Sequence, residues 1–319
     1  MFDRSTFLKK IFYAIILLVL YATAASQALQ SFSYKWTTIA VDDRYSLNHV
    51  FSGEAPRPFA FRVLVPVVLN ETYDAIPKNL SGLLLERSRR VLDAVVGAQE
   101  SALLDDSIAI KYGFLTVLNF VLLLLTMLLL RELAKRVVCP GSGCRFLVDA
   151  SPLFFALMLT ISYRAHNGFH YDHAELFFYC SYLILIMGRH WWAALSVLVL
   201  SVLNKETAML FPLIAFFAFH KDALWRREGT VWKNVILQSG VAIVVHMGVR
   251  SLISVGGPSA ELHFLDNISF WFSWEPWFSV TTPHMALLPL PKPSNILLLV
   301  PLMALVFSGW AKKPLCVRN

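Results

Sequence analysis

Long apolar runs that alternate with short charged segments are the feature that most restricts the fold of this chain. The run Tyr112–Leu130 contains no charged residue, and about 20 apolar residues are enough to cross the hydrocarbon core of a membrane as a helix. Hydrophobic residues make up 57% of the 319 residues, charged residues only 15%, and mean hydropathy is +0.59. Soluble domains rarely have such a composition. The sequence therefore predicts an all-α, polytopic transmembrane bundle.

The apolar runs predict about eight membrane spans. The first run, Ile11–Leu20, follows three basic residues and has the shape of a signal peptide, but apolar character continues to Leu29. We therefore expect a retained signal anchor, with cleavage as the alternative. Further spans are expected at Tyr112–Leu130, Phe146–Ser162, Ala174–Gly188, Trp191–Leu203, Ala208–Phe219, Asn234–Gly248 and Ile296–Gly309.

The distribution of Lys and Arg in the short loops predicts the orientation. Eight spans place three basic clusters on the same side as the N-terminus, which by the positive-inside rule is the cytoplasmic side. Both termini are then cytoplasmic, and topology accounts for the net charge of +7 without a nucleic-acid partner. The clusters are Arg131, Lys135, Arg136 and Arg145; Lys221, Arg226, Arg227 and Lys233; and Lys312, Lys313 and Arg318.

We expect one membrane domain over residues 1–319 with two longer extracytoplasmic segments. The first is the loop Gln30–Lys111, in which Pro58–Leu69 and Ser81–Val96 read as amphipathic helices that lie on the membrane. The second is Arg250–Asn295, rich in Trp, Phe and Pro around Phe270–Phe278, as expected of a segment at the membrane interface.

Two of the predicted spans are short and form a hairpin. Trp191–Leu203 and Ala208–Phe219 each reach only about 20 Å, less than the roughly 30 Å of hydrocarbon. A single continuous helix would carry Lys205 and Glu206 through the bilayer centre at high cost. Two short helices with the tip Asn204–Thr207 toward a polar cavity avoid this cost.

Two groups of acidic residues are candidates for chemistry on the extracytoplasmic side. Asp42 and Asp43 follow the first span, and such carboxylates can serve as a general base, bind a divalent cation, or simply be solvated. The turn Tyr163–Glu175 also holds His166, His170, His173, Asp172 and Glu175. This turn is either a metal site or a polar pocket, and we leave the metal and any divalent cofactor open.

Isolated cations mark the outer ends of otherwise apolar segments. Arg62, Arg164, Lys205 and Arg250 lie where the positive-inside rule should deplete positive charge. Arg can hold a phosphate through two parallel hydrogen bonds, and Lys supplies a point charge. Together these cations would form an anion site at the membrane boundary; singly, each can reach lipid phosphates. Lys205 can also pair with its neighbour Glu206.

The order of these features resembles the GT-C superfamily of membrane glycosyltransferases, and most of all its uncharacterised bacterial members. The matching positions are Asp42 or Asp43 after the first span, the two amphipathic helices, and Asp172 in Tyr-Asp-His. The stretch Arg57–Pro66 and the turn Asn204–Thr207 are also similar. The resemblance extends to about Gly248, and it implies a bacterial cytoplasmic (inner) membrane location and a polyprenyl-phosphate-linked sugar as donor.

The resemblance also implies roles for the charged residues in an inverting sugar transfer. Asp42 or Asp43 would deprotonate the acceptor hydroxyl, and Asp172 would orient the acceptor or position a cation. Glu206, His170 and His173 would support the site. The cations that would stabilise the departing lipid phosphate are Arg62, Arg164, Lys205 and Arg250.

Two interpretations from other classes remain open. A transporter or flippase for an anionic or lipid-linked substrate would use the same cations and the broken hairpin as its binding site. A non-catalytic membrane assembly subunit would instead bind a partner through Phe270–Phe278.

Overall fold

A computed structural model describes residues 4–36, 47–52, 62–95, 97–102, 104–138, 145–165 and 169–253, with residue 273 and the pairs 278–279 and 290–291. The predicted all-α class is confirmed; β1 (Phe278–Ser279) and β2 (Leu290–Pro291) form only a two-residue antiparallel pair. The helices are α1 (Arg4–Trp36), α2 (Leu47–Ser52), α3 (Leu64–Asp74), α4 (Lys78–Val95), α5 (Ala98–Ala102), α6 (Asp106–Val138), α7 (Arg145–Ala165), α8 (Asp172–Met187), α9 (Trp191–Asn204), the 3-10 helix η3 (Glu206–Leu210), α10 (Phe211–Trp225) and α11 (Gly229–Leu252).

Four helices are long and apolar enough to cross a membrane. The apolar stretches are Phe7–Ser33, Asp106–Val137, Arg145–Tyr163 and Gly229–Leu252, in α1, α6, α7 and α11. Large apolar side chains are exposed along all four, as expected of helices that face lipid. The fold is therefore consistent with an integral membrane protein. Helices α8, α9 and α10 have 16, 14 and 15 residues and reach about 21 to 24 Å.

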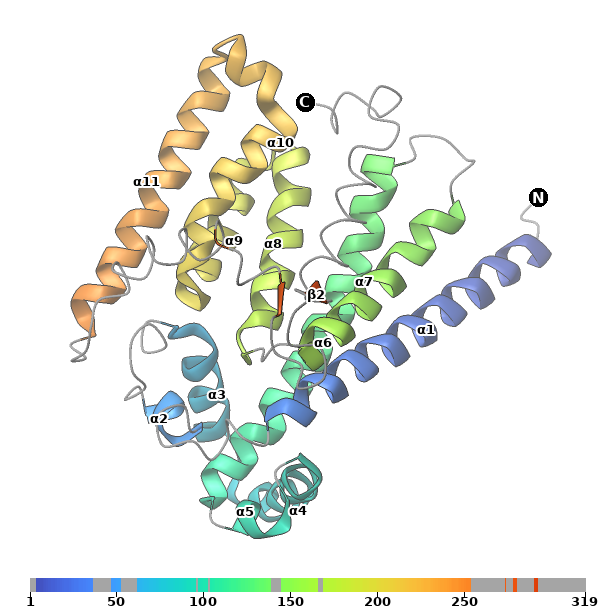
Figure 1. Ribbon diagram of the computed structural model, residues 1–319, viewed down its shortest axis with the longest axis vertical. Coiled ribbons are helices and arrows are strands. Elements are labelled where there is room, and N and C mark those ends of the chain that lie inside the picture. The colour runs from blue at the N-terminus through green and yellow to red at the C-terminus, as the bar shows by residue number, and fades with distance from the viewer. Residues whose placement is uncertain are drawn as a thin grey trace.

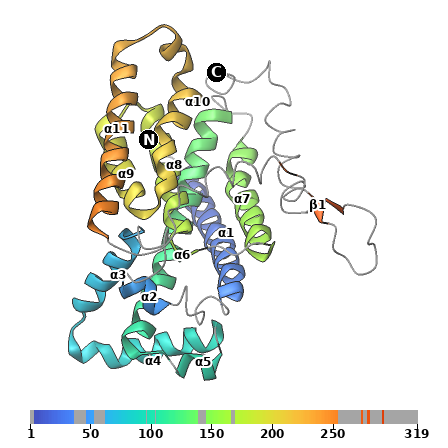
Figure 2. The same ribbon diagram turned by 60° about the vertical axis from the view of Figure 1, so that its left-hand side comes forward.

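The long helices run between two ends of the molecule. At the lower end of Figure 1 lie α2 to α5, the start of α8 and the end of α11. Helix α1 begins, α6 ends and α10 turns into α11 at the upper end. Figure 2 shows α4 crossing below the bundle rather than running with it. We refer to these as the lower end and the upper end.

The helices form two hydrophobic cores that meet at α8. One core joins α1, α6 and α7 with the lower-end helices, and its centre includes the fully buried Tyr21, Leu92 and Leu123. The other joins α8 to α11 around Tyr182, Phe216 and other buried side chains. The first turn of α8 therefore lies between two packed units, and this position fixes the side chains of the site described below.

The two amphipathic helices expected in the first loop correspond to α3 and α4. Helix α3 begins at Leu64 and continues to Asp74, beyond the apolar run. Pro66 fits in its first turn because the backbone N–H groups of that turn have no hydrogen-bond partner within the helix. Helix α4 starts at Lys78, three residues before the predicted Ser81. Arg89 fastens α4 to the start of α6 by hydrogen bonds to Leu104 O (2.6 Å) and Asp106 Oδ1 (2.8 Å).

An ion pair near the upper end joins three of the long helices. Asp149 of α7 is 5% exposed, accepts a hydrogen bond from Arg131 Nε of α6 at 2.6 Å, and is hydrogen-bonded by the Tyr13 hydroxyl of α1. Tyr21 donates to the backbone oxygen of Asp149 at 2.8 Å. These contacts lock α1, α6 and α7 together.

Replacing Asp149 with Asn should lower the free energy of unfolding by about 2 kcal/mol. The substitution leaves the Arg131 guanidinium without its carboxylate, and the penalty is smaller than for a fully buried pair because Arg131 is 38% exposed. Thermal unfolding in detergent would measure the loss. Glu132→Gln, which breaks a surface pair with Arg136 one helical turn away, should change stability by less than about 0.5 kcal/mol; equal losses in the two variants would contradict this account.

Candidate polar site at the lower end

Three separate segments of the chain bring charged side chains together at the lower end. They are the residues just before α3, the turn and first helical turn at 169–175, and the break between α9 and η3. We call the group Arg62, Tyr171, Asp172, Glu175, Lys205 and Glu206 the polar site. Arg62 is buried, and the four other charged residues are 19 to 25% exposed.

The hairpin between α9 and α10 breaks where the sequence predicts. Helix α9 ends at Asn204, and Lys205 has an extended backbone (φ −160°, ψ 134°) before η3 begins at Glu206. Asn204 is fully buried, and its Nδ2 donates to Tyr171 O at 2.9 Å, which ties the break to the turn before α8. The predicted hairpin tip is therefore confirmed as an interruption held by a buried amide.

Arg62 and Glu206 form a two-point ion pair across the site. Arg62 Nε donates to Glu206 Oε2 at 3.2 Å, and Nη2 donates to Oε1 at 2.8 Å. The guanidinium also lies over the Tyr171 ring, 4.1 Å from its centroid. Two parallel hydrogen bonds and a ring contact fix the orientation of the guanidinium more closely than one hydrogen bond would. The loop before α3 is thereby attached to the hairpin tip.

Lys205 is held by two carboxylates on one face of α8. Its Nζ donates to Asp172 Oδ1 at 3.0 Å and to Glu175 Oε2 at 2.6 Å. Burial lowers the pKa of Lys205, but the two carboxylates raise it more, so that the net pKa lies above its ordinary value and the amine stays protonated. An ammonium has three N–H donors, of which the described carboxylates take two. The ammonium also lies 5.7 Å from the centroid of the Tyr171 ring.

The carboxylates that hold Lys205 have further hydrogen-bond partners. Asp172 Oδ2 accepts the backbone N–H of Phe169 at 2.8 Å, and Glu175 accepts the hydroxyl of Thr207. Asp172 and Glu175 are three residues apart in the first turn of α8, so they lie on the same face. The polar site as defined above contains two cations and three carboxylates, so its net charge is −1.

Two buried histidines next to the site pack against aromatic rings. His170 is 2% exposed and packs edge-on against Tyr171, and the fully buried His173 packs against Phe32 of α1. Burial lowers the pKa of His170 from 6.5 to about 3, against the opposing effect of the Asp172 carboxylate. His170 is therefore neutral at physiological pH.

Stability should fall as the pH drops below about 6.5. The unfolded chain protonates His170 near its ordinary pKa, whereas the folded protein resists protonation until about pH 3, so the unfolded state binds more protons in between. We expect a loss of about 1 kcal/mol between pH 7 and pH 5.5 from this residue. Thermal unfolding of His170→Gln at pH 7 and pH 5.5 should show that much less pH dependence than the parent, and an unchanged pH dependence would contradict this account.

The structure brings together some of the predicted site residues and leaves others outside its description. Arg62 pairs with Glu206, Lys205 pairs with Asp172, and both cations lie over the Tyr171 ring, against which His170 packs. His173 packs against Phe32 instead. Arg250 lies in the last turn of α11, which is also at the lower end. Asp42, Asp43 and His166 lie outside the described residues, as does the side chain of Arg164. Within the described ranges, no three His, Cys, Asp or Glu side chains are grouped to hold a metal ion.

Two contributors to the site received too little weight from sequence reasoning. Glu175 was considered only as a metal ligand, although its spacing from Asp172 predicts a shared helical face. Tyr171, the ring under Arg62, has no sequence signal beyond its place beside Asp172. The neighbours Lys205 and Glu206 do not pair with each other as considered above; an extended backbone directs successive side chains to opposite sides, so they reach different partners.

Comparison with protein-family models, curated proteins and solved structures gives no match to this chain. The class of the protein therefore follows from its own fold and composition. It is an all-α protein with four helices suited to cross a membrane and a compact, nearly neutral network of ionised side chains at one end.

Proposed function

We propose that this protein transfers a sugar from a polyprenyl-phosphate donor to an acceptor on the extracytoplasmic face of a membrane. The observation that carries the proposal is Lys205: a protonated, partly exposed amine that two described carboxylates hold in place beside the Tyr171 ring. Such a group can donate to a phosphate oxygen without reorganising. The ion pair between Arg62 and Glu206 holds the hairpin tip to the residues just before α3.

The proposed reaction is one displacement at the anomeric carbon. The acceptor oxygen forms a bond to that carbon, the bond from the carbon to the phosphate oxygen breaks, and polyprenyl phosphate leaves with the electron pair. Asp42 or Asp43 takes the proton of the acceptor hydroxyl. Lys205 stabilises the charge on the departing phosphate, with Arg62, Arg164 and Arg250 as further cations of the site, and Asp172 positions Lys205.

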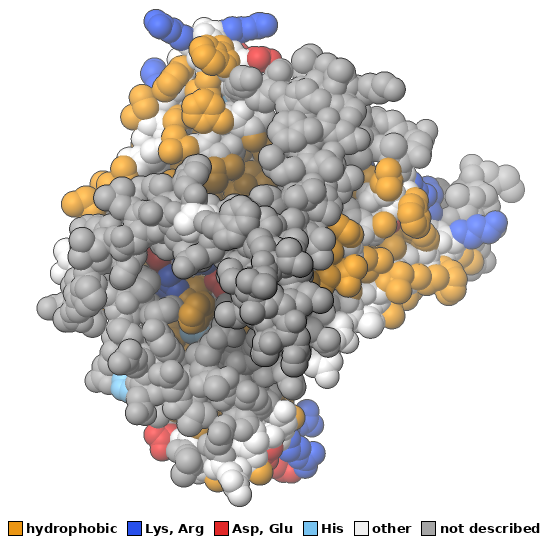
Figure 3. Space-filling view, in the orientation of Figure 1, with side chains coloured by type: hydrophobic (Ala, Val, Ile, Leu, Met, Phe, Trp, Pro, Cys, Tyr) orange, Lys and Arg blue, Asp and Glu red, His pale blue; other side chains and the backbone are white. Residues whose placement is uncertain are grey.

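The proposed topology has about eight spans with both termini in the cytoplasm of a bacterial cell. The basic side chains over the connection between α10 and α11 support it; Figure 3 shows Lys and Arg at the lower end as well, where α4 carries Arg87, Arg89 and Arg90. The polar site is at the opposite end, beside α2 to α5, which would then lie on the extracytoplasmic surface. Ile296–Gly309, the eighth predicted span, is outside the described residues.

The proposal is tested by the fate of the donor in proteoliposomes. Purified protein would be mixed with polyprenyl-phosphate sugars and with an extract of the host envelope as the source of acceptor, and mass spectrometry would follow release of polyprenyl phosphate. We expect protein-dependent release that Asp172→Asn abolishes. Asp93→Asn, an exposed carboxylate on α4, is the matched control and should retain it.

A flippase is the second candidate, favoured by the broken hairpin with ionised side chains at its tip. A flippase would move the labelled donor to the other leaflet without converting it to polyprenyl phosphate. Movement without conversion would therefore reject the transferase proposal in favour of transport.

A further inference from the structure

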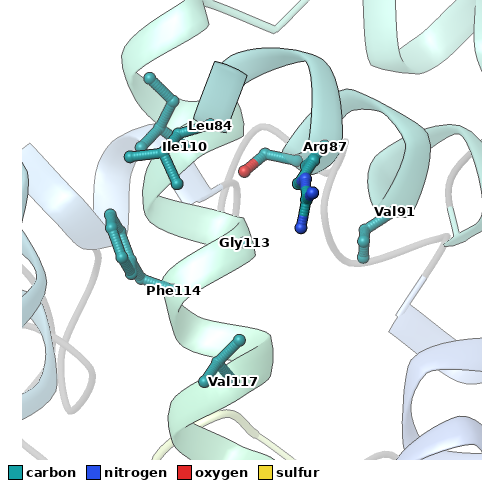
Figure 4. Close-up of a pocket in the computed structure, with 8 residues that line it drawn as sticks. Leu84, Arg87, Val91, Ile110, Gly113, Phe114 and Val117 are labelled. Atoms are coloured by element: carbon teal, nitrogen blue, oxygen red, sulfur yellow. The ribbon is translucent and has the colours of Figure 1, made fainter. Parts of the chain in front are cut away.

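A shallow apolar groove runs between α4 and α6, away from the polar site. It has a volume of about 180 Å³, below the roughly 300 Å³ of small-molecule sites, so it suits one segment of a flexible chain better than a whole compact ligand. Figure 4 shows the Arg87 side chain extending from α4 alongside α6. The lining residues are Leu84, Arg87, Ser88 and Val91 of α4 and Ile110, Gly113, Phe114 and Val117 of α6.

A close contact between the two helices fixes the groove. A Cβ atom on Gly113 would lie 2.2 Å from Ser88 Oγ and 3.1 Å from Ser88 Cβ, so the backbone of α6 approaches α4 as only glycine allows. Ser88 is itself buried. The groove is thus bounded by a packed helix crossing rather than by mobile side chains.

The position of α6 places the groove across the membrane boundary. Between Lys111 and Arg131 the helix has 19 uncharged residues, and about 30 Å of helix separates these two cations, which matches the hydrocarbon thickness. Lys111 therefore marks the outer boundary. Val117, six residues further along and 61% exposed, lies about 9 Å inside the hydrocarbon. The crossing helix α4 lies at the level of the lipid headgroups.

Arg87 supplies a positive charge where the groove meets the boundary. Its neighbours are engaged: Arg89 binds Asp106 and backbone oxygens, and Arg90 pairs with Glu86 at 2.5 Å. No described carboxylate forms an ion pair with Arg87, whose side chain is exposed. A guanidinium above an apolar groove is complementary to a phosphate that carries an acyl chain.

We infer that the groove between α4 and α6 binds an anionic phospholipid, with one acyl chain against Phe114 and Val117 and the headgroup phosphate on Arg87. An anionic headgroup is favoured over a zwitterionic one because the latter would bring a second cation next to Arg87. The site is distinct from the polar site and needs no sugar transfer. Its occupant would hold α4 on the membrane surface.

The test counts phosphatidylglycerol molecules bound to the full-length protein by native mass spectrometry in detergent. Arg87→Gln should weaken binding about fivefold, the effect of about 1 kcal/mol for one basic residue at a charged lipid surface. Val117→Trp should also weaken binding, because the larger side chain fills the end of the groove that Val117 lines. The control is Arg90→Gln, which removes a cation that is already paired with Glu86, three residues from Arg87 on the same helix. This variant should bind the lipid as the parent does.

Two lipid probes complete the experiment. Phosphatidylcholine with the same chains should bind more weakly than phosphatidylglycerol to the parent protein and equally to Arg87→Gln, and glycerol phosphate, which has no chain, should not bind. Equal losses in Arg87→Gln and Arg90→Gln, or unchanged binding in both Arg87→Gln and Val117→Trp, would overturn the inference. Binding of glycerol phosphate as tight as that of the lipid would overturn it as well.

Discussion

Replacing Lys205 with Met should reduce sugar transfer by about 100-fold or more. Methionine keeps an unbranched side chain of similar length but removes the one ammonium group that Asp172 and Glu175 hold at the site. Losing a preorganised donor that stabilises developing charge typically costs two to three orders of magnitude in rate. The rate of polyprenyl phosphate release in proteoliposomes measures the effect.

Lys78→Met is the matched control for this prediction. Lys78 begins α4 at the same end of the molecule, and its side chain is exposed. Its replacement should leave the rate within about twofold, because an exposed charge away from the reacting groups contributes little. If Lys205→Met unfolds at the same temperature as the parent protein and releases polyprenyl phosphate at the same rate, Lys205 takes no part in the reaction.

Replacing Arg62 with Met should lower the free energy of unfolding by about 2 kcal/mol. Arg62 is 8% exposed, and its loss leaves Glu206 half-buried without the two donors that satisfy its carboxylate. Breaking a fully buried pair costs about 3–5 kcal/mol, and the 25% exposure of Glu206 reduces that figure here. Thermal or denaturant unfolding in detergent gives the change.

A double-mutant cycle separates the ion pair from the packing of its members. Because Arg62→Met and Glu206→Met each leave one charge behind, the double variant should be more stable than the sum of the two losses predicts. The surface pair Arg90 and Glu86 provides the comparison cycle, with a coupling below about 1 kcal/mol. Strict additivity at Arg62 and Glu206 would mean that the two side chains do not interact as described.

Sequence reasoning located the long helices α1, α6, α7 and α11 and the hairpin tip because both depend on local pattern. The charged residues Lys205 and Glu206 interrupt an apolar stretch, and the cost of charge in hydrocarbon predicts a break there, as found. The all-α class follows from composition in the same way. The boundaries of α3 were less well predicted, since its polar last turn to Asp74 lies beyond the apolar run.

The partners of the charged residues were not predictable from local pattern. Arg62 and Glu206 are separated by 144 positions, and Lys205 and Asp172 by 33. Such pairs form only when α3, α8 and the hairpin tip pack together, and no periodicity in the sequence encodes that packing. Sequence reasoning predicted that Arg62 and Lys205 bind a phosphate, which stays a prediction, whereas their carboxylate partners in the folded protein emerge only from the tertiary structure.

Binding of a labelled polyprenyl-phosphate sugar is the measurement that tests the central claim most directly. Saturable binding to the parent protein should be competed by polyprenyl phosphate but not by polyprenol, which lacks the phosphate, and Lys205→Met should bind at least about tenfold more weakly. Lys78→Met should bind like the parent. Equal competition by polyprenol, or unchanged affinity in Lys205→Met, would contradict the assignment of the polar site to a lipid-linked phosphate.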